Sequence, residues 1–189
     1  MVYRLPFEFE RLDISDVILI KPKIFNDSRG YFMETFVKKT FENFGIDFNV
    51  VQENQSYSRK GVLRGLHYQL GKYVQAKIVR VLKGEIFDVA VDLRQSSPTF
   101  GKSIKVNLSE GNKNMLYIPR GFAHGFEVLS EDAIVVYLID NDYEPKMEAG
   151  IRWNDPDLNI NWPIKSPILS EKDSKWPTVK EAKANNLLI

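Results

Sequence analysis

The feature that most constrains the fold is an alternation of apolar and polar residues with a period of two, which dominates the chain from Ala76 onward. Such alternation is typical of β-strands that bury one face. The predicted strands are short and are separated by turn-forming residues such as Pro119-Arg120-Gly121. Many short strands at this spacing predict an all-β sandwich or barrel. The expected strands cover residues 76–82, 85–93, 103–108, 115–118, 125–129 and 133–139.

The first two of these strands flank Lys83-Gly84, a short break in which glycine can supply a positive φ. This spacing predicts a β-hairpin. One face of its second strand is expected to carry four apolar side chains, those of Phe87, Val89, Val91 and Leu93.

Helical spacing is scarce in this sequence. One helix is expected over about 35–44, because apolar residues recur there at steps of three and four before Gly45 ends the pattern. We expect this helix to cover or plug a sheet. After Trp153 the chain is rich in Asp, Asn and Pro, which predicts ordered loop followed by a loose helix over 178–189.

Composition limits the class of protein. A chain of 189 residues favours one compact domain over residues 1–189, since domains commonly have about 150 residues. With 26 basic and 25 acidic residues, the net charge of +1 provides no cationic surplus for nucleic acid. The absence of Cys excludes disulfides and thiolate chemistry.

Neither an export signal nor a membrane segment is expected. Arg4, Glu8 and Glu10 interrupt the first ten residues, where a signal peptide would need an apolar stretch. The longest apolar run, 133–139, has seven residues, whereas a membrane-spanning helix needs about 20. These features predict a soluble, cytoplasmic protein.

Two histidines are the candidate acid–base residues. His67 lies in RGLHY and His124 lies in PRGFAHG, so glycines flank both. Glycine allows close approach of backbone or ligand, although a lone histidine can also be structural. Position 69 is Gln, where an H-x-H metal-binding pair would need His. We therefore expect no metal, and favour acid–base chemistry on an organic substrate.

Lys77 and Tyr137 are further candidates because each shares a predicted strand face with apolar residues. Lys77, beside Val79, is either an edge-strand charge that blocks strand pairing or a functional group. Tyr137, beside Val135, is either a core residue with a satisfied hydroxyl or a proton donor in a cavity. Composition and periodicity alone indicate only an all-β domain with a possible polar cavity.

Several motifs together make the chain resemble the dTDP-4-dehydrorhamnose 3,5-epimerase family of nucleotide-sugar enzymes. They share their order and spacing across most of the chain. The motifs are FNDSRGYFMETF from Phe25, VQENQSYS from Val51, GVLRGLHYQ from Gly61, AKIVRVLKGEIFDVAVDLR from Ala76, YIPRGFAHGF from Tyr117, GIRWNDPDLNINWP from Gly150 and LSEKD from Leu169.

This resemblance implies a cupin jelly-roll barrel of two antiparallel sheets with a few short helices, working as a homodimer whose N-terminal strands reach the partner. It also implies a reaction: inversion of carbons 3 and 5 of a thymidine diphosphate 4-keto-6-deoxyglucose. No cofactor is expected, because the ketone acidifies both neighbouring C–H bonds. Such chemistry needs a base, an acid on the opposite face of the ring and a positive group near the ketone oxygen.

The resemblance also assigns roles to individual residues. His67 is the expected base, and Asp173 in LSEKD is expected to orient it and stabilise its imidazolium. Lys77 is expected near the ketone oxygen, and Tyr137 is the expected proton donor. The substrate-binding residues are expected to be Arg29, Glu34, Gln52, Asn54, Arg64, His124, Tyr143, Glu148 and Lys172.

Within this set, Arg29 and Arg64 suit the diphosphate, since guanidinium groups bind such oxygens bidentately. Tyr143 is expected to stack on the thymine, and Arg29 and Glu34 are expected to serve the partner's site. The chain departs from the family pattern after Tyr137, where many members continue with Lys and this one has Leu138. Position 138 should face away from the cavity because its strand parity is opposite to that of Tyr137.

Three alternatives stay open at this stage. One is an epimerase that inverts a single carbon or uses another nucleotide 4-keto sugar. Another is a non-catalytic cupin that binds a sugar nucleotide, although such a protein would be expected to lack His67, Tyr137 or Asp173. The third is a metal-dependent cupin oxygenase, which the missing metal ligands oppose.

Overall fold

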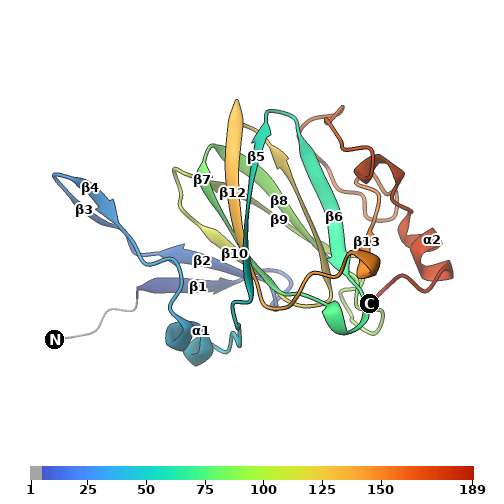
Figure 1. Ribbon diagram of the computed structural model, residues 1–189, viewed down its shortest axis with the longest axis horizontal. Coiled ribbons are helices and arrows are strands. Elements are labelled where there is room, and N and C mark those ends of the chain that lie inside the picture. The colour runs from blue at the N-terminus through green and yellow to red at the C-terminus, as the bar shows by residue number, and fades with distance from the viewer. Residues whose placement is uncertain (1–5) are drawn as a thin grey trace.

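Two antiparallel sheets face each other and form a barrel in the computed structural model, which describes residues 6–189 (Figure 1). The six-stranded sheet has the order β1-β2-β10-β7-β12-β5. Its strands are β1 (Phe7–Arg11), β2 (Ile18–Pro22), β10 (Met115–Ile118), β7 (Lys77–Lys83), β12 (Asp132–Ile139) and β5 (Gln52–Arg59).

The second sheet has five strands in the order β13-β6-β11-β8-β9. They are β13 (Glu148–Gly150), β6 (Leu63–Gln69), β11 (Phe122–Val128), β8 (Glu85–Asp92) and β9 (Ser103–Ser109). The remaining two strands, β3 (Phe25–Asp27) and β4 (Gly30–Phe32), form a separate hairpin. The prediction of an all-β jelly roll with two antiparallel sheets is confirmed.

The predicted hairpin between residues 76–82 and 85–93 is wrong. The two segments are strands, but β7 pairs with β10 and β12, whereas β8 pairs with β11 and β9. Gly84, with a φ of +80°, is therefore a corner at which the chain passes from one sheet to the other. A Cβ atom there would lie 2.1 Å from the carbonyl oxygen of Asp132, so the corner requires glycine.

The apolar residues form three clusters. The first fills the barrel between the sheets and includes Val79, Ala90 and Phe126. A second covers the outer face of the five-stranded sheet, and the predicted set Phe87, Val89, Val91 and Leu93 packs in it. The third covers the outer face of the six-stranded sheet and includes Phe41. Both faces of β8 are therefore covered. Its inward face carries Asp88 and Ala90, whereas the four apolar residues predicted to share a face lie on its outward face.

The early helix is shorter than predicted. Helix α1 covers Lys38–Phe44 and ends at Gly45 in the left-handed region, with Val37 as an extended N-cap. Phe36 precedes the helix. It fits the apolar spacing that predicted a helix because it packs against Phe41, with ring centroids 4.9 Å apart. Phe41 is fully buried in the third cluster, so α1 covers the outer face of a sheet, as expected.

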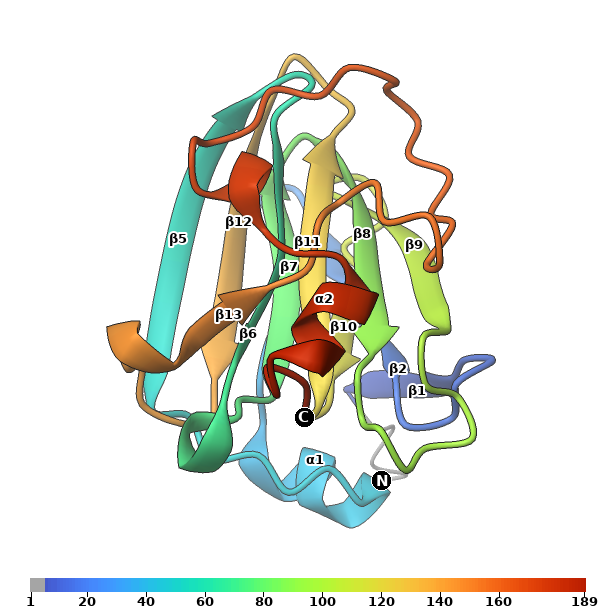
Figure 2. The same ribbon diagram turned by 90° about the vertical axis from the view of Figure 1, so that its right-hand side faces the viewer.

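The chain after Trp153 has little regular structure, as predicted, and lies over the outer face of the five-stranded sheet (Figure 2). A parallel bridge joins Ile168 to Val62 just before β6. Short 3-10 helices cover Gly71–Tyr73, Pro145–Met147 and Asp173–Lys175, and α2 covers Val179–Ala184. The helix expected over 178–189 is thus limited to six residues, with Thr178 as its N-cap. No helix in residues 6–189 is long and apolar enough to cross a membrane.

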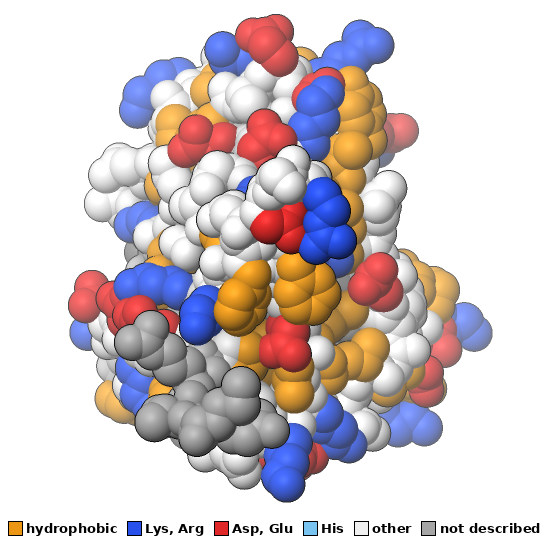
Figure 3. Space-filling view, turned by 90° about the vertical axis from the view of Figure 1, so that its left-hand side faces the viewer, with side chains coloured by type: hydrophobic (Ala, Val, Ile, Leu, Met, Phe, Trp, Pro, Cys, Tyr) orange, Lys and Arg blue, Asp and Glu red, His pale blue; other side chains and the backbone are white. Residues whose placement is uncertain are grey.

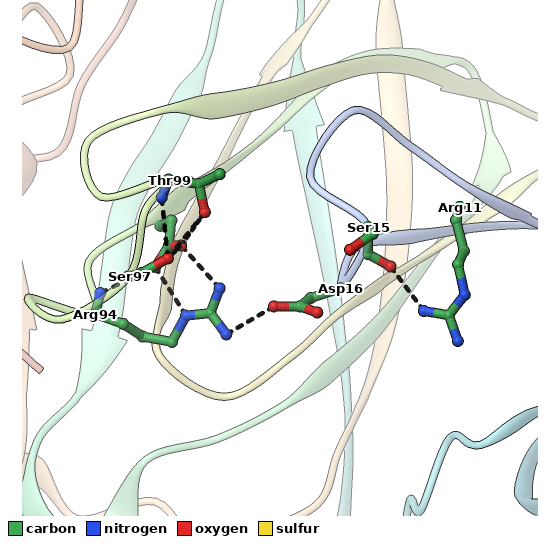
Figure 4. A network of polar contacts seen from close by, with 7 residues as sticks. Arg11, Ser15, Asp16, Arg94, Ser97 and Thr99 are labelled. Atoms are coloured by element: carbon green, nitrogen blue, oxygen red, sulfur yellow. Dashed lines mark hydrogen bonds and ion pairs between the residues drawn. The ribbon is translucent and has the colours of Figure 1, made fainter.

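A polar network joins the β1–β2 turn to the segment after β8 (Figure 4). Asp92 accepts hydrogen bonds from Arg94, from the hydroxyl of Ser97 at 2.6 Å and from that of Thr99 at 2.6 Å. Arg94 also pairs with Asp16 at 2.8 Å. Because the Asp92 side chain is fully buried, these donors replace the water that its charge would otherwise require.

Candidate active site

A cavity of about 400 Å³ lies at one end of the barrel, between the two sheets. Strands β5, β7 and β12 of one sheet face β6 and β13 of the other across it. Polar side chains predominate in its lining. The residues are Gln52, Asn54, Gln55, Ser56, Arg64, His67, Tyr68, Gln69, Gln75, Lys77, Tyr137, Ile139, Tyr143 and Glu148.

His67 and Asp173 form a hydrogen-bonded pair at this cavity. The Nε2 atom of His67 lies 2.6 Å from Oδ1 of Asp173. The Asp173 side chain is 5% exposed and that of His67 is 30% exposed, so the imidazole stands between a buried carboxylate and the cavity. Since a carboxylate can only accept, Nε2 carries the proton and Nδ1 is left as the basic nitrogen.

Two neighbours hold Asp173 in place. Trp176 donates its Nε1–H to Oδ1 at 3.2 Å, and the backbone N–H of Asp173 donates to the hydroxyl of Ser170 at 3.0 Å. Burial works to raise the pKa of Asp173, but the hydrogen bond from His67 and that from Trp176 outweigh burial and lower this pKa. Asp173 is therefore a charged partner for His67 at neutral pH.

The glycines beside the two histidines permit β6 and β11 to approach closely. A Cβ atom on Gly65 would lie 2.5 Å from the Cα of Gly125, and one on Gly125 would lie 2.8 Å from the carbonyl oxygen of Arg64. His67 pairs directly with His124 across the same two strands. These glycines therefore set the position of His67 through backbone packing.

Lys77 points into the cavity from β7, a central strand of the six-stranded sheet. Its alternative interpretation as an edge-strand charge is therefore wrong. Burial lowers the pKa of Lys77 to about 8, an effect that the negative charges of Asp88 and Glu148 partly oppose. Lys77 is thus a partly buried ammonium group at the wall of a polar cavity.

Tyr137 lies beside Lys77 on the neighbouring strand, since β12 pairs Tyr137 with Val79 and Ile139 with Lys77. Burial raises the pKa of Tyr137, with a smaller opposing effect from Arg64. Its phenol is therefore protonated at neutral pH and can act as a donor. His67 comes from the opposite sheet, so the two groups reach the cavity from opposite walls.

Arg64, Gln52 and Asn54 line the cavity as well. Arg64 donates from Nε to the hydroxyl of Ser58 at 2.9 Å, which ties its guanidinium to β5. Gln52 donates to the side-chain oxygen of Asn54 at 2.7 Å. These contacts fix the positions of a guanidinium and two amides in the cavity lining.

Glu148 connects two more of the expected binding residues. Lys172 pairs with its Oε1 at 2.5 Å, and the phenol of Tyr143 donates to its Oε2 at 2.6 Å. The hydrogen bond to Glu148 raises the pKa of Tyr143 to about 12. Tyr143 is 48% exposed and belongs to the cavity lining, which leaves it open to a planar ligand.

The structure does not bring Arg29 and Glu34 to this cavity. Arg29 lies in the turn of the β3–β4 hairpin, paired with Asp27 at 2.6 Å, and its side chain is 88% exposed. The hairpin extends away from the barrel in Figure 1, and Figure 3 shows hydrophobic side chains on the face from which it projects. Phe25, Tyr31 and Phe32 of this hairpin are exposed.

His124 also differs from expectation, because it does not line the cavity. It is 6% exposed, and its Nε2 lies 2.9 and 3.1 Å from the two carboxylate oxygens of Asp88. Both side chains face the barrel interior, where Phe126 and Ala90 share their strand faces. This arrangement therefore does not favour direct contact between His124 and a ligand in the cavity.

Sequence reasoning missed two polar residues near the cavity. Ser56 lines it, and its hydroxyl is buried without a hydrogen-bond partner in residues 6–189. Asp88 is fully buried on the inward face of β8. The apolar residues of β8 lie on its other face, which the C-terminal segment covers, so Asp88 is left on the face that looks into the barrel. Ser56 shares a strand face with Gln52 and Asn54, which could have indicated its position.

No group of three or more His, Asp or Glu side chains in residues 6–189 is arranged to hold a metal ion. The cavity instead contains a histidine–carboxylate pair on one wall and a tyrosine with a lysine on the other. Such a fold and site define a cupin-type barrel with groups that can accept and donate protons from opposite walls of one cavity.

Comparisons with known proteins identify the family. The model of the dTDP-4-dehydrorhamnose 3,5-epimerase family matches residues 11–181. The enzyme of that name from Shigella flexneri is 56% identical over 164 residues, which cover 86% of this chain and 91% of the relative. The chain belongs to the dTDP-4-dehydrorhamnose 3,5-epimerase family, as its sequence motifs predicted.

Solved structures agree with this assignment. A dTDP-6-deoxy-D-glucose-3,5-epimerase from Legionella pneumophila, in complex with dTDP-4-keto-L-rhamnose, has a TM-score of 0.92 and 46% identity, covering 96% of this chain and 97% of that one. A 3'-monoepimerase from Streptomyces bikiniensis, in complex with dTDP-quinovose, has a TM-score of 0.88 and 37% identity, covering 94% of this chain and 90% of that one.

Proposed function

We propose that this protein is an isomerase that inverts carbons 3 and 5 of dTDP-4-dehydro-6-deoxy-D-glucose and yields dTDP-4-dehydro-L-rhamnose for dTDP-L-rhamnose biosynthesis. The observation that carries the proposal is the placement of His67 and Tyr137 on opposite walls of one cavity, with Lys77 beside Tyr137. The membership of the chain in the epimerase family supports the same reaction.

The reaction needs only proton transfers. His67 takes the proton from the carbon next to the ketone, the C–H electron pair moves into an enolate, and the new negative charge collects on the ketone oxygen. Lys77 stabilises that charge, because an ammonium group in a partly buried site interacts with it more strongly than one in bulk water. Tyr137 then donates its proton to the opposite face of the same carbon, which inverts it. His67 then releases its proton to water and Tyr137 regains one from water, after which the same steps at the second carbon complete the reaction.

Asp173 acts on the substrate only through His67. Its carboxylate holds the imidazole in the tautomer with a proton on Nε2, and stabilises the imidazolium that forms when Nδ1 takes a proton. Because the ketone supplies the acidity of both C–H bonds, the proposal includes no cofactor and no metal.

The substrate's thymidine diphosphate would be held at the open end of the cavity. Arg64 would bind a diphosphate oxygen, and the exposed ring of Tyr143 would stack on the thymine. Gln52 and Asn54 supply amide groups for hydroxyl or carbonyl oxygens. Glu148 and Lys172 support Tyr143 through the hydrogen bond and ion pair described above.

We place Arg29 and Glu34 in the site of a second subunit. They sit on or beside a hairpin that projects from the barrel, and its exposed aromatic residues would be buried in a homodimer. A cytoplasmic location remains part of the proposal as well.

The 37% identity to a 3'-monoepimerase favours one alternative, an enzyme that inverts a single carbon. Mass spectrometry of the sugar nucleotide after reaction in heavy water distinguishes the two. Inversion of both carbons adds two deuterium atoms and inversion of one adds one. Absence of deuterium from the product would overturn the proposed function. Dialysis of the enzyme against a chelator, with activity retained, tests the absence of a metal.

A further inference from the structure

The segment that carries Tyr143 has an irregular backbone. Residues 140–144 lie outside any helix or strand, between the end of β12 and the 3-10 helix Pro145–Met147. The phenol of Tyr143 is held at its tip by Glu148, but that hydrogen bond does not fix the backbone from which the ring projects. Peptide groups outside regular structure need other partners, and side chains can supply them.

Gln75, two residues before β7, holds the N-terminal side of this segment. It is 7% exposed, and its Nε2 donates to the carbonyl oxygens of Asn141 at 3.2 Å and Asp142 at 3.0 Å. The Asn141 side chain donates in return to the carbonyl oxygens of Lys72 at 2.8 Å and Val74 at 3.2 Å. Each of the two segments therefore binds the backbone of the other through a side-chain amide.

Gln69, the last residue of β6, holds the C-terminal side. It is 4% exposed, and its Oε1 accepts a hydrogen bond from the backbone N–H of Glu144 at 3.0 Å. The N–H of Leu70 donates to the carbonyl oxygen of Met147 at 2.9 Å and continues this attachment. Tyr143 thus lies between two points at which buried glutamines grip the chain. The position that a metal-binding H-x-H pair would fill with histidine is used here to hold a backbone.

We propose that Gln69 and Gln75 are positioning residues for nucleotide binding, which hold the Tyr143 ring at the cavity ready to stack on the base of a nucleoside diphosphate. They act through the backbone of residues 141–144. The inference rests on the proposed function, in which Tyr143 stacks on thymine. Affinity increases when the ring is ordered before the ligand arrives, because binding then loses less conformational freedom.

The first test is a double-mutant cycle on the Kd of dTDP, measured by calorimetry. Tyr143→Ala should raise this Kd by about 10-fold, because stacking on the base is lost. Gln75→Leu, which removes the donor and keeps an apolar side chain of similar size, should raise it by about 5-fold. In the Tyr143→Ala background the same change should have less than about a twofold effect. Additive effects of the two substitutions would overturn the proposal.

A ligand without a base separates an effect on stacking from general damage to the cavity. The Kd of inorganic pyrophosphate should be the same in Gln75→Leu and in the wild type. In steady-state kinetics KM should rise while kcat stays within about twofold, because the glutamine contacts involve neither His67 nor Tyr137. Equal weakening of pyrophosphate and dTDP would contradict the inference.

The matched control is Asn112→Ala. The side chain of Asn112 also bonds to backbone, accepting from the N–H groups of Ser109 and Asn114 and donating to the carbonyl oxygen of Asn107, in a turn outside the cavity lining. This variant should lose stability with no change in the Kd of dTDP. A Kd that rises equally in Asn112→Ala and Gln75→Leu would attribute the effect to lost stability and would overturn the proposal.

Gln69→Leu provides an independent variant should Gln75→Leu not fold, because the two glutamines hold different points of the segment. It should also raise the Kd of dTDP, and its effect should disappear in the Tyr143→Ala background. An unchanged Kd in a folded Gln69→Leu variant would contradict the role of Gln69.

A second readout needs neither ligand nor activity. In protein labelled with 3-fluorotyrosine, the ¹⁹F signal of Tyr143 is assigned by its loss in Tyr143→Phe. In Gln75→Leu and Gln69→Leu this signal should narrow and move towards that of free fluorotyrosine, whereas Asn112→Ala should leave it unchanged. An unmoved signal in both glutamine variants would overturn the proposal.

These measurements separate the failure of this inference from the failure of the proposed function. Failure of the wild type to epimerise its substrate would reject the proposed function, and the binding cycle on dTDP would still be interpretable. An unchanged Kd in Tyr143→Ala would reject stacking on thymine and this inference with it. A raised Kd in Tyr143→Ala, with an additive effect of Gln75→Leu, would reject the inference alone.

Discussion

His67 and Asp173 are 106 residues apart in the sequence, and their side chains meet at 2.6 Å between Nε2 and Oδ1. His67 is fixed by β6, and Asp173 is brought to it by the irregular C-terminal segment that covers the same sheet. The bridge between Val62 and Ile168 and the hydrogen bond from Leu63 N–H to the Ile168 carbonyl hold that segment at the sheet edge. The geometry of this proposed catalytic pair thus depends on how the C-terminal segment and the sheet are joined.

His67→Asn removes the basic nitrogen from the cavity and keeps a polar side chain. We expect kcat to fall by about 10³-fold or more, because general base catalysis contributes on the order of 10² to 10⁴. Affinity for dTDP should change little, since Arg64 and Tyr143 remain. The measurements are the rate of solvent exchange at the substrate carbons and the Kd of dTDP by calorimetry. Exchange at the wild-type rate would remove His67 from the mechanism.

Asp173→Asn should lower turnover less than His67→Asn, by roughly 10²-fold, because the imidazole survives with a poorer orienting partner. An amide can present its N–H₂ group to Nε2 and favour the wrong tautomer. Steady-state kcat of the two single variants and of the double variant provides the comparison. Turnover at the wild-type level in Asp173→Asn would show that the pair is not required.

Tyr137→Phe separates packing from proton donation, because the ring and its buried area remain while the donor is lost. The variant should fold, and His67 should still remove substrate protons. The enolate can then be reprotonated only from the side that the proton left. We therefore expect exchange with solvent to continue while inversion becomes far slower. Equal losses in exchange and inversion would mean that Tyr137 positions the substrate or supports the base.

Asp92→Asn tests the network that joins β8 to the β1–β2 turn (Figure 4). Burial opposes ionisation of Asp92, but its hydrogen bonds to Arg94, Ser97 and Thr99 lower its pKa from 3.8 to about 2. Since the folded-state pKa is the lower one, this stabilisation is complete above about pH 4 and is lost as the pH falls towards 2.

We expect the substitution to lower the free energy of unfolding by about 3 kcal/mol at pH 7, because it leaves Arg94 without its buried partner. The difference from the wild type should shrink between pH 4 and pH 2. Urea unfolding at several pH values measures both effects. A difference that stays constant down to pH 2 would show that the charge of Asp92 is not the source of the stabilisation.

The strands could be predicted from the sequence because alternation reports which residues share a face. Each of the six predicted segments corresponds to one strand, with ends that differ by at most three residues. Their partners could not be predicted in the same way. Lys83-Gly84 has the sequence of a hairpin turn, but Gly84 forms a corner between the sheets. Which strands pair depends on contacts with strands distant in the sequence. Alternation also cannot tell which face of a doubly covered strand looks into the barrel, which is why Asp88 was missed.

The proposed catalytic residues were accessible to sequence analysis for a different reason. His67, Lys77 and Tyr137 lie in motifs of the epimerase family, and the structure brings all three to one cavity. The same motifs include His124, for which the structure shows a buried contact with Asp88 instead of a place in the cavity lining. A motif therefore indicates that a residue belongs to the site region, whereas burial and partners decide what it can do there.

Proton NMR of the protein with dTDP-4-dehydro-6-deoxy-D-glucose in heavy water tests the central claim most directly. It follows the hydrogens on carbons 3 and 5 separately and reports the configuration of each carbon from the coupling constants. The account predicts that both hydrogens are replaced by deuterium and that the product has the L configuration of dTDP-4-dehydrorhamnose. Replacement and inversion at one carbon alone, or no replacement at either, would contradict it.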